Sequence, residues 1–268
     1  SVLLPVRNGQ TTLARALDSL LVQTFSGFEI VAIDDGSTDQ TWDLLQEYAG
    51  KDKRIRPVRT APQGIVPALN LALELSRAEY LARMDCDDIC LPERLALQAG
   101  YLDKHPETAL VSCRVAFGGD RQEAAGYARY VDWTNTLLTH DQISLARFRE
   151  SPLAHPSVMF RKSVVQAHGG YKDGDFPEDY ELWLRWLEQG VFMAKLDREL
   201  LVWNDPPGRL SRTHHRYDPQ AFYRIKAEYL ARWLARNNPH HPRVTIIGSG
   251  RTSRKRSDLL LEHGVRIT

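Results

Sequence analysis

Short apolar segments alternate with amphipathic segments over the first 113 residues, and this alternation constrains the fold most strongly. The expected strands are residues 2–5, 28–33, 55–59, 80–84 and 109–113. The segments between them carry apolar residues at helical spacing, for example Leu13, Leu17 and Leu20. Repeated strand–helix–strand units predict an α/β fold with a doubly wound, mostly parallel sheet flanked by helices.

Acidic clusters follow the second and the fourth of these strands. Asp34 and Asp35 form the first cluster, and Asp85 and Asp87 belong to the second. Because doubly wound sheets bind ligands at the carboxyl ends of their strands, both clusters are expected in one cleft. If the fourth strand continues, Asp85 and Asp87 share a face, whereas Asp88 points to the other face. Asp88 is then expected to support the metal ligands or to cap a helix.

Two neighbouring carboxylates repel each other unless a cation lies between them. Oxygen ligands favour a hard divalent ion, so Asp85 and Asp87 predict a site for Mg²⁺ or Mn²⁺. Such an ion at a strand end is well placed to hold a diphosphate. The alternative for Asp34 and Asp35 is a turn, since Asp-Gly-Ser-Thr is also turn and helix-cap chemistry.

The second half of the chain is less regular. Residues 118–150 are polar and aromatic, and we interpret them as the acceptor side. Further expected elements are a strand at 157–161 entering a short helix, a helix at 179–189 and an amphipathic helix at 219–236. Trp183 and Trp186 are expected in the core. The 219–236 helix is expected to pack on the domain, and a membrane-surface role through Arg232 and Arg236 is the alternative.

Residues 241–268 have a different character. A strand at 243–250 ending in Gly248-Ser249-Gly250, a helix with three leucines and a strand from Gly264 predict a second, Rossmann-like strand–helix–strand unit. Ser253 stands where a dinucleotide-binding motif has its third glycine, which argues against a cofactor site. We therefore expect one domain over 1–240 and a truncated unit over 241–268. The chain opens directly in a strand, so a trimmed start is also expected.

Composition narrows the choice of partners and compartment. The formal net charge is +1, which gives no general attraction to nucleic acid. No apolar run approaches the roughly 20 residues of a membrane span, and no signal peptide is visible. Three cysteines, an odd and low number, are typical of a reducing compartment and are expected as buried thiols. These features predict a cytoplasmic protein, with peripheral attachment at the inner face of the membrane as an option.

Four motifs occur in a characteristic order, at residues 2–9, 34–37, 83–88 and 177–183. In this order and at these separations they resemble the family 2 glycosyltransferases with the GT-A fold, and the resemblance covers about residues 1–215. It implies an inverting, metal-dependent enzyme that transfers a hexosyl or N-acetylhexosaminyl unit from a nucleoside-diphosphate sugar, with UDP favoured. The acceptor implied is a hydroxyl of a cell-surface glycan or of a glycan on a lipid carrier.

The resemblance also assigns roles to individual residues. The implied donor-binding residues are Pro5, Arg7, Asn8, Asp34, Asp35, Gly64, Arg83, Asp85 and Arg212. Arg7 stands where many relatives have an aromatic residue, and a guanidinium can also stack on a base. Asp87 resembles the metal ligand, with Asp85 assisting. Asp179 resembles the catalytic base, and Glu178 and His155 are implied on the acceptor side. A structural role for His155 is the alternative.

Two rival functions fit the sequence less well than glycosyl transfer does. A sugar nucleotidyltransferase would need a glycine-rich first loop with Arg or Lys for a triphosphate, and Pro5-Val6-Arg7-Asn8-Gly9 fits this poorly. A non-catalytic nucleotide-sugar-binding subunit would not need Asp85, Asp87 and Asp179 together.

Overall fold

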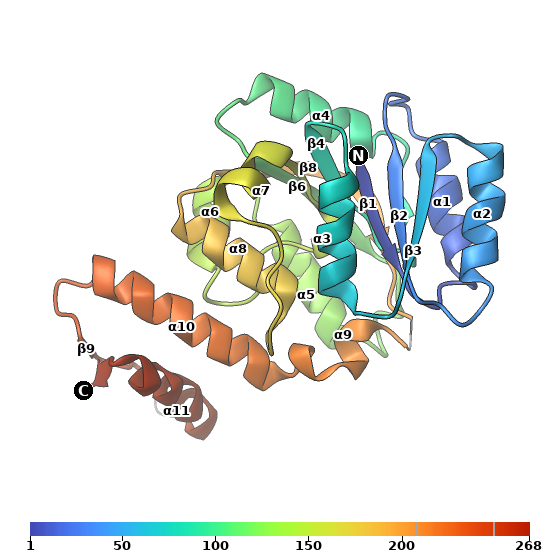
Figure 1. Ribbon diagram of the computed structural model, residues 1–268. Coiled ribbons are helices and arrows are strands. Elements are labelled where there is room, and N and C mark those ends of the chain that lie inside the picture. Colours follow the sequence, from blue (N-terminus) through green and yellow to red (C-terminus); the bar gives the residue numbers. More distant parts are fainter. Residues whose placement is uncertain (207, 249) are drawn as a thin grey trace.

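A mixed sheet of eight strands runs through the computed structural model, in the order β3-β2-β1-β4-β7-β6-β8-β5 (Figure 1). The structure describes residues 1–206, 208–248 and 250–268. The strands are β1 Val2–Val6, β2 Ile30–Asp35, β3 Ile55–Thr60, β4 Tyr80–Arg83, β5 Ile89–Cys90, β6 Leu110–Phe117, β7 Met159–Arg161 and β8 Met193–Trp203. Strands β3, β2, β1 and β4 pair in parallel with one another, and β6 is parallel to β8, whereas β5 is antiparallel to β8. β7 runs antiparallel between β4 and β6. The predicted doubly wound, mostly parallel sheet is confirmed.

Helices cover both faces of the sheet. Helices α1 Leu13–Leu21, α2 Thr41–Lys51 and α4 Arg94–Lys104 contribute to one core cluster, which α5 Ala125–Asn135 joins through Val131. Helices α3 Ile65–Leu75, α6 His140–Ala146, α7 Lys162–His168 and α8 Glu178–Glu188 contribute to the cluster on the other face. The molecule therefore has three layers, with the sheet in the middle.

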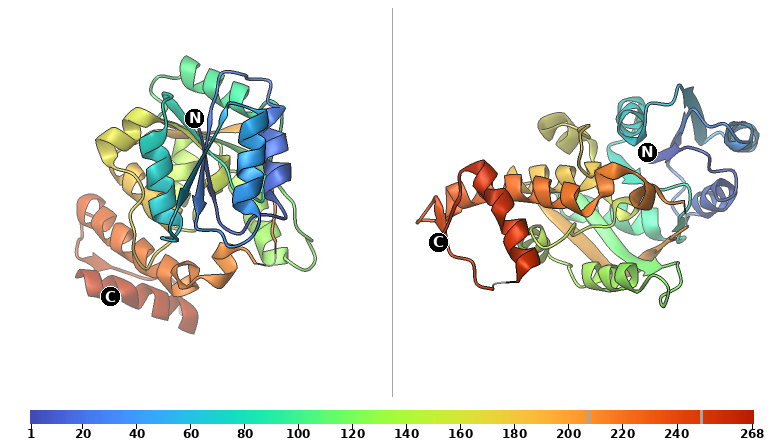
Figure 2. Two further views of the ribbon diagram at one scale, coloured as in Figure 1. Left: turned by 45° about the vertical axis from the view of Figure 1, so that its right-hand side comes forward. Right: turned by 90° about the horizontal axis from the view of Figure 1, so that it is seen from below.

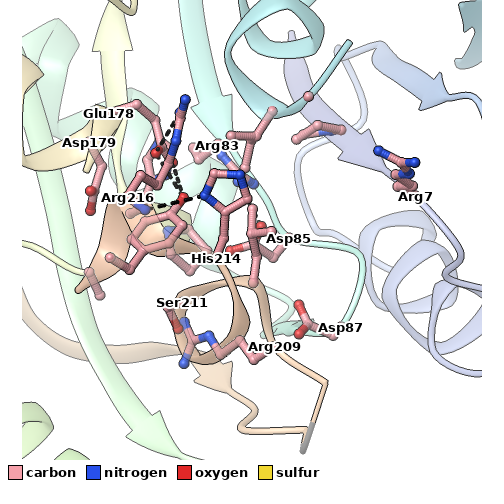
Figure 3. A pocket seen from close by; sticks show the side chains of 18 of the residues that line it. Arg7, Arg83, Asp85, Asp87, Glu178, Asp179, Arg209, Ser211, His214 and Arg216 are labelled. Atoms are coloured by element: carbon pink, nitrogen blue, oxygen red, sulfur yellow. Dashed lines mark hydrogen bonds and ion pairs between the residues drawn. The ribbon is translucent and has the colours of Figure 1, made fainter. Parts of the chain in front are cut away.

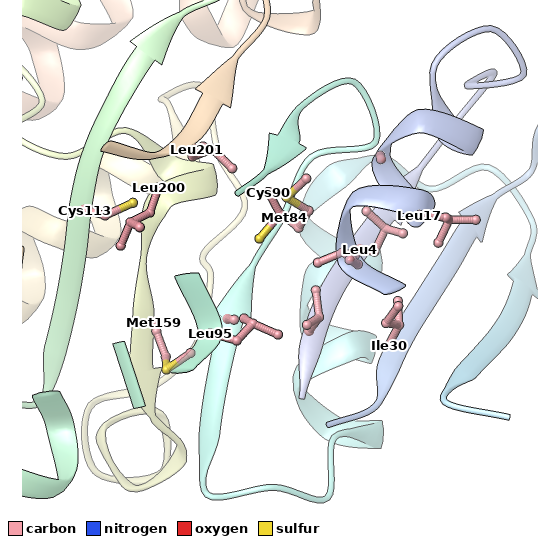
Figure 4. Packing of buried hydrophobic residues seen from close by; sticks show 14 of the residues in the cluster. Leu4, Leu17, Ile30, Met84, Cys90, Leu95, Cys113, Met159, Leu200 and Leu201 are labelled. Atoms are coloured by element: carbon pink, nitrogen blue, oxygen red, sulfur yellow. The ribbon is translucent and has the colours of Figure 1, made fainter. Parts of the chain in front are cut away.

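The alternation of side chains along the strands explains why two cores form. In β1, Leu4 packs in the first cluster, shown in Figure 4, and its neighbour Leu3 packs in the second. Because successive side chains of a strand point to opposite faces, a strand that is apolar throughout must be covered on both sides. Trp183 and Trp186 of α8 are fully buried in the second cluster, as predicted.

The expectation of buried thiols is confirmed for two of the three cysteines. Cys90 and Cys113 are buried in the first cluster, whereas Cys86 is half-buried beside it. All three are free.

Two regions differ from the sequence prediction. Residues 118–150, expected to be irregular, contain α5 and α6. β8, eleven residues long, was not predicted at all, and it pairs with β6 across a register shift near Arg114. A polar run, Asp197-Arg198-Glu199, interrupts its apolar pattern on the exposed stretch of the strand. That interruption hides the strand from a periodicity argument.

The C-terminal part wraps along one side of the domain (Figure 2). It comprises α9 Leu210–Thr213, α10 Pro219–Asn237, β9 Arg243–Val244, α11 Arg251–Ser257 and β10 Arg266–Ile267, with three-residue and six-residue 3₁₀ turns at His215–Tyr217 and Asp258–His263. Another 3₁₀ turn lies at His155–Ser157. Helix α10 packs on α8 through Ile225 and Tyr229, which confirms its predicted packing role. Arg232 and Arg236, considered for a membrane surface, lie 3.1 and 3.5 Å from Glu188.

The last residues form a strand–helix–strand unit, since β9 and β10 pair in parallel around α11. Strand β9 spans two residues rather than the predicted 243–250, and Ser249 of the glycine motif lies outside the described residues. Leu260 and Val265 pack this unit against α10. That it begins a further domain stays a prediction. Among the described helices, none has the length and apolar character needed to span a membrane.

Candidate active site

A cleft of about 1100 Å³ opens where β1, β2 and β4 end. It is lined by most of the residues singled out from the sequence, namely Pro5, Arg7, Asn8, Asp35, Gly64, Arg83, Asp85, Asp87, His155, Glu178 and Asp179. The first eight come from strand ends and the loops after them, and they form what we call the donor wall. The last three lie on the opposite wall, next to residues 208–217, which we call the cap segment. The convergence of both acidic clusters on one cleft agrees with the prediction.

The loops after β1 and β2 hold each other in place. The Asn8 side chain accepts a hydrogen bond from the Thr38 amide at 2.9 Å, and the Asn8 amide donates to Ser37 Oγ at 2.9 Å. Asp35 accepts from the amides of Gln63 and Gly64 at 2.7 and 2.9 Å. The backbone on the donor wall is thereby fixed before any ligand arrives, while Arg7 remains more than half exposed.

Asp34 occupies a different position from its neighbour. Its side chain is fully buried and does not line the cleft. It accepts a hydrogen bond from the Ser37 amide at 3.0 Å, and Arg59 Nε lies 3.2 Å from Oδ2. In this structure Asp34 therefore stabilises the turn after β2, which is the alternative that the sequence left open. Asp35 is the member of the pair that faces the cleft.

Three carboxylates gather after β4. One ligand atom from each of Asp85, Asp87 and Asp88 lies within 4.8 Å of the others. The expectation that Asp88 points away was wrong, because β4 ends at Arg83 and the chain then turns, with the Asp88 amide donating to the Asp85 carbonyl at 3.3 Å. The two-residue alternation of a strand does not apply within a turn. Asp88 is instead buried behind the other two carboxylates.

The chemistry of this cluster fits a divalent cation. Burial and the neighbouring Asp85 raise the pKa of Asp87 to about 6, and burial raises the pKa of Asp88 well above its usual range. Asp88 Oδ1 accepts from the Asn204 amide at 2.8 Å, but its Oδ2 is buried without a hydrogen-bond partner. A cation relieves both the repulsion and the unsatisfied oxygen, and hard oxygen ligands suit Mg²⁺ or Mn²⁺.

Arginine side chains offset part of this negative charge. Arg83 is almost completely buried and donates to Asp85 Oδ1 at 2.6 Å. Arg209 approaches from the cap segment, stacked on Trp203 with 3.9 Å between the guanidinium carbon and the ring centroid, and it lowers the pKa of Asp87 (Figure 3). Among the described residues, none accepts a hydrogen bond from the buried nitrogen Nη1 of Arg209.

The sequence analysis selected Arg212 from this segment, and the structure places it elsewhere. Arg212 pairs with Asp205, Nε to Oδ1 at 3.0 Å, lies over the ring of Tyr127 and does not line the cleft. Both arginines belong to the same short motif. Their sequence spacing alone does not show which one turns inward, whereas the stacking of Arg209 on Trp203 does.

Asp179 lies at the first turn of α8, across the cleft from the acidic cluster (Figure 3). Its Oδ1 accepts from the Tyr180 amide at 2.7 Å. Packing against protein and the adjacent Glu178 raise its pKa to about 7. A carboxylate that is partly open to the cleft and titrates near neutrality can accept a proton from a hydroxyl.

The other two residues of the opposite wall are more enclosed. His155 is 9% exposed, its Nε2 lies 2.8 Å from the Tyr171 hydroxyl, and burial together with Arg83 keeps its pKa well below the usual value. It is therefore a neutral imidazole at pH 7. Glu178 is 1% exposed, and the Tyr217 hydroxyl donates its one hydrogen between the two carboxylate oxygens, at 2.8 and 2.7 Å. Sequence reasoning missed Tyr217, since no motif points to this contact.

Comparison with known sequences gives a consistent result. The model described as "Glycosyl transferase family 2" matches residues 1–169. Amylovoran biosynthesis glycosyltransferase AmsE of Erwinia amylovora is 33% identical over 211 residues, covering 75% of this chain and 74% of that protein. O-antigen biosynthesis glycosyltransferase WbnJ of Escherichia coli is 30% identical over 190 residues, covering 70% and 72% of the two chains.

Solved structures share the fold at low sequence identity. TarS 1–349 of S. aureus in complex with UDP-GlcNAc has a TM-score of 0.62 and 17% identity, over 99% of this chain and 81% of that one. The longer TarS chain is covered over 43% of its length. Mannosyltransferase PcManGT from Pyrobaculum calidifontis in complex with GDP-Man and Mn²⁺ has a TM-score of 0.63 and 19% identity, over 98% and 68%. These are GT-A glycosyltransferases. The sheet, the cleft at its strand ends and the match over residues 1–169 thus have one explanation: the chain is a GT-A glycosyltransferase of glycosyl transferase family 2.

Proposed function

We propose that this protein is an inverting, metal-dependent glycosyltransferase that moves a hexosyl or N-acetylhexosaminyl unit from a nucleoside-diphosphate sugar, with UDP favoured, to a hydroxyl of a cell-surface glycan. One observation carries the proposal. Asp85 and Asp87, which form a cluster suited to a cation with the buried Asp88, line the cleft, and Asp179, whose pKa is about 7, lies on the wall opposite. Charge stabilisation for a leaving group and a base for an attacking hydroxyl are thus separated by the space a sugar would occupy.

The donor wall supplies the contacts for the nucleotide. We assign Pro5, Arg7, Asn8 and Asp35 to the nucleoside end, because they line the part of the cleft where β1 and β2 end. Asp85 and Asp87, supported by Asp88, would hold Mn²⁺ or Mg²⁺, which offsets charge on the departing diphosphate. Arg209 would donate to the same diphosphate through its unpartnered nitrogen.

The reaction itself is a single displacement. The acceptor oxygen attacks the anomeric carbon as the bond from that carbon to the diphosphate oxygen breaks, and the carbon inverts. The hydroxyl proton passes to a carboxylate oxygen of Asp179. Glu178 and His155 contribute to the shape of this wall, and the neutral imidazole of His155 adds no charge beside the acceptor.

The acceptor class follows from the relatives. AmsE and WbnJ carry the names of enzymes of amylovoran and O-antigen biosynthesis. Another relative, 26% identical, is named a UDP-Glc:alpha-D-GlcNAc-diphosphoundecaprenol glucosyltransferase. We therefore propose a growing glycan on a lipid carrier as the acceptor, met by a cytoplasmic enzyme at the inner face of the membrane.

A transfer assay tests the proposal. The protein is incubated with Mn²⁺, a panel of UDP- and GDP-sugars and a GlcNAc-diphospholipid, and the anomeric configuration of the product is read by NMR. Transfer with inversion is expected from one donor, and transfer with retention would refute the mechanism.

A further inference from the structure

Glu178 was expected to contact the acceptor, but in the structure its carboxylate contacts the cap segment. Both of its carboxylate oxygens accept from the Tyr217 hydroxyl, and Arg216 Nη1 lies 3.5 Å from Oε2 (Figure 3). Its side chain is 2% exposed, so little of its surface remains for a substrate. The residues that occupy it both belong to the cap segment, residues 208–217.

The same segment carries groups that face the cleft. Arg209, Ser211 and His214 line the cleft, as do Asp85 and Asp87 of the acidic cluster. Ser211 Oγ and one Arg209 nitrogen are buried without partners. The segment thus brings an arginine, a serine and a histidine side chain to the wall of the cleft.

The cap segment has few other anchors on this wall. Arg216 also binds Asp173 on the loop before α8, and this carboxylate is 67% exposed. His215 lies 3.2 Å from Asp175, and both side chains are more than half exposed. Although Arg216 is itself only 12% exposed, an ion pair with a solvent-exposed carboxylate stabilises little, whereas a buried hydrogen bond to a carboxylate stabilises more. The contact between Glu178 and Tyr217 is the buried one.

We propose that Glu178 is a positioning residue, which latches the cap segment to the first turn of α8 through Tyr217 and Arg216 and so sets the position of Arg209 over the donor diphosphate. The latch rests on the proposed function for its role in donor binding, but it exists in the protein without ligand. The latch joins Glu178, the neighbour of the proposed base Asp179, to the cap segment, which would cover the leaving group.

The latch predicts that cap-segment amides exchange faster with solvent when it is broken. Tyr217→Phe removes the hydrogen bond to Glu178, and Glu178→Gln removes the charge that Tyr217 and Arg216 bind, so hydrogen exchange over residues 208–217 should accelerate by about 10- to 100-fold in both. The double variant should exceed Glu178→Gln by little, because both substitutions weaken the same contact and Glu178→Gln also weakens the ion pair with Arg216. Tyr229→Phe is the matched control. It removes a 2.6 Å hydrogen bond from a tyrosine hydroxyl to Glu181, which lies on α8 as Glu178 does, but away from the cap segment.

Measurements of nucleotide binding and of the pH dependence of activity distinguish the latch from a direct role of Glu178 in proton transfer. Both variants should raise the KM for the donor, or the Kd for UDP with Mn²⁺, by about 10-fold or more with a smaller change in kcat. Glu178 faces Tyr217 and Arg216 of the cap segment, Arg83 of β4 and its neighbour Asp179. Its loss of charge in Glu178→Gln should therefore move the acid limb of the pH profile downward, whereas Tyr217→Phe should not.

Unchanged exchange over residues 208–217 in both variants would overturn the latch, as would a fall in kcat at constant KM. If the wild-type protein binds no nucleotide, the proposed function fails, but faster exchange in both variants would still support the latch.

Discussion

On the donor wall of the cleft, side chains are tied to the main chain of neighbouring loops, as Asn8 is to Thr38 and Asp35 is to Gly64. On the opposite wall, Glu178 is held by other side chains from the cap segment. The donor wall is therefore continuous with the backbone of the sheet, and substitutions in it should lower the free energy of unfolding. The opposite wall can lose side-chain contacts while the sheet stays intact, so substitutions there should change kcat or KM more than they change stability.

The largest expected effect is on the opposite wall, at Asp179. Replacing it by Asn keeps the size of the side chain but removes the proton acceptor, so kcat/KM should fall by about 10²- to 10⁴-fold. Asp175→Asn serves as a matched control, because that carboxylate is 86% exposed in the loop before α8. Steady-state transfer rates measure both. Full activity in Asp179→Asn would remove the base assignment.

The same substitution should stabilise the protein. The pKa of Asp179 is about 7 when folded, above its ordinary 3.8, so stability is lost as pH rises through this range. At pH 8, Asp179→Asn should therefore raise the free energy of unfolding, on the order of 2 kcal/mol. The gain should be small near pH 4, well below the folded pKa, and vanish below about pH 3, where the carboxyl is protonated in both states. Urea unfolding at the two pH values measures it, and equal gains at both would contradict the shifted pKa.

The pH profile gives an effect of intermediate size. Because Asp179 must be ionised to accept a proton, kcat/KM should rise about tenfold per pH unit below pH 7 and level off above it. Saturating Mn²⁺ keeps Asp87 ionised and removes its contribution to the acid limb. A profile that is flat between pH 5.5 and 8 would show that proton transfer to Asp179 does not control the rate.

The smallest expected effect tests the donor wall. Gly36 has φ +65°, and an added Cβ would lie 2.6 Å from Pro62. Gly36→Ala should therefore destabilise the fold by about 1–3 kcal/mol. Gly50→Ala in α2 is the matched control, because no atom lies within 4 Å of its added Cβ, and it should stabilise the helix slightly. Thermal unfolding compares them, and equal midpoints would contradict the rigid donor wall.

The donor wall was also the part that the sequence predicted well. Its strands are short, apolar on both faces and followed by acidic residues, so β1, β2 and β4 and the cleft at their ends were all expected. The capping box of α6, in which Thr139 accepts from the Gln142 amide, was an available signal for structure within residues 118–150. Sequence reasoning did not use it.

Other features depended on tertiary contacts. Asp88 joins the cluster only because the chain turns after Arg83, and a strand rule could not show this. The inward position of Arg209 depends on Trp203, at the end of the strand that was missed. The bond between Glu178 and Tyr217 joins residues 39 positions apart, which no local pattern encodes.

The central claim is that the acidic cluster binds a metal together with a nucleotide. It is tested most directly by the thermal unfolding midpoint with UDP, GDP, CDP, dTDP or ADP, each with and without Mn²⁺, for the wild type and Asp87→Ala. A ligand that binds only the folded protein raises the midpoint by mass action. We predict a metal-dependent rise with one nucleotide, UDP, that is lost in Asp87→Ala. The absence of any rise, or the same rise in Asp87→Ala, would contradict the claim.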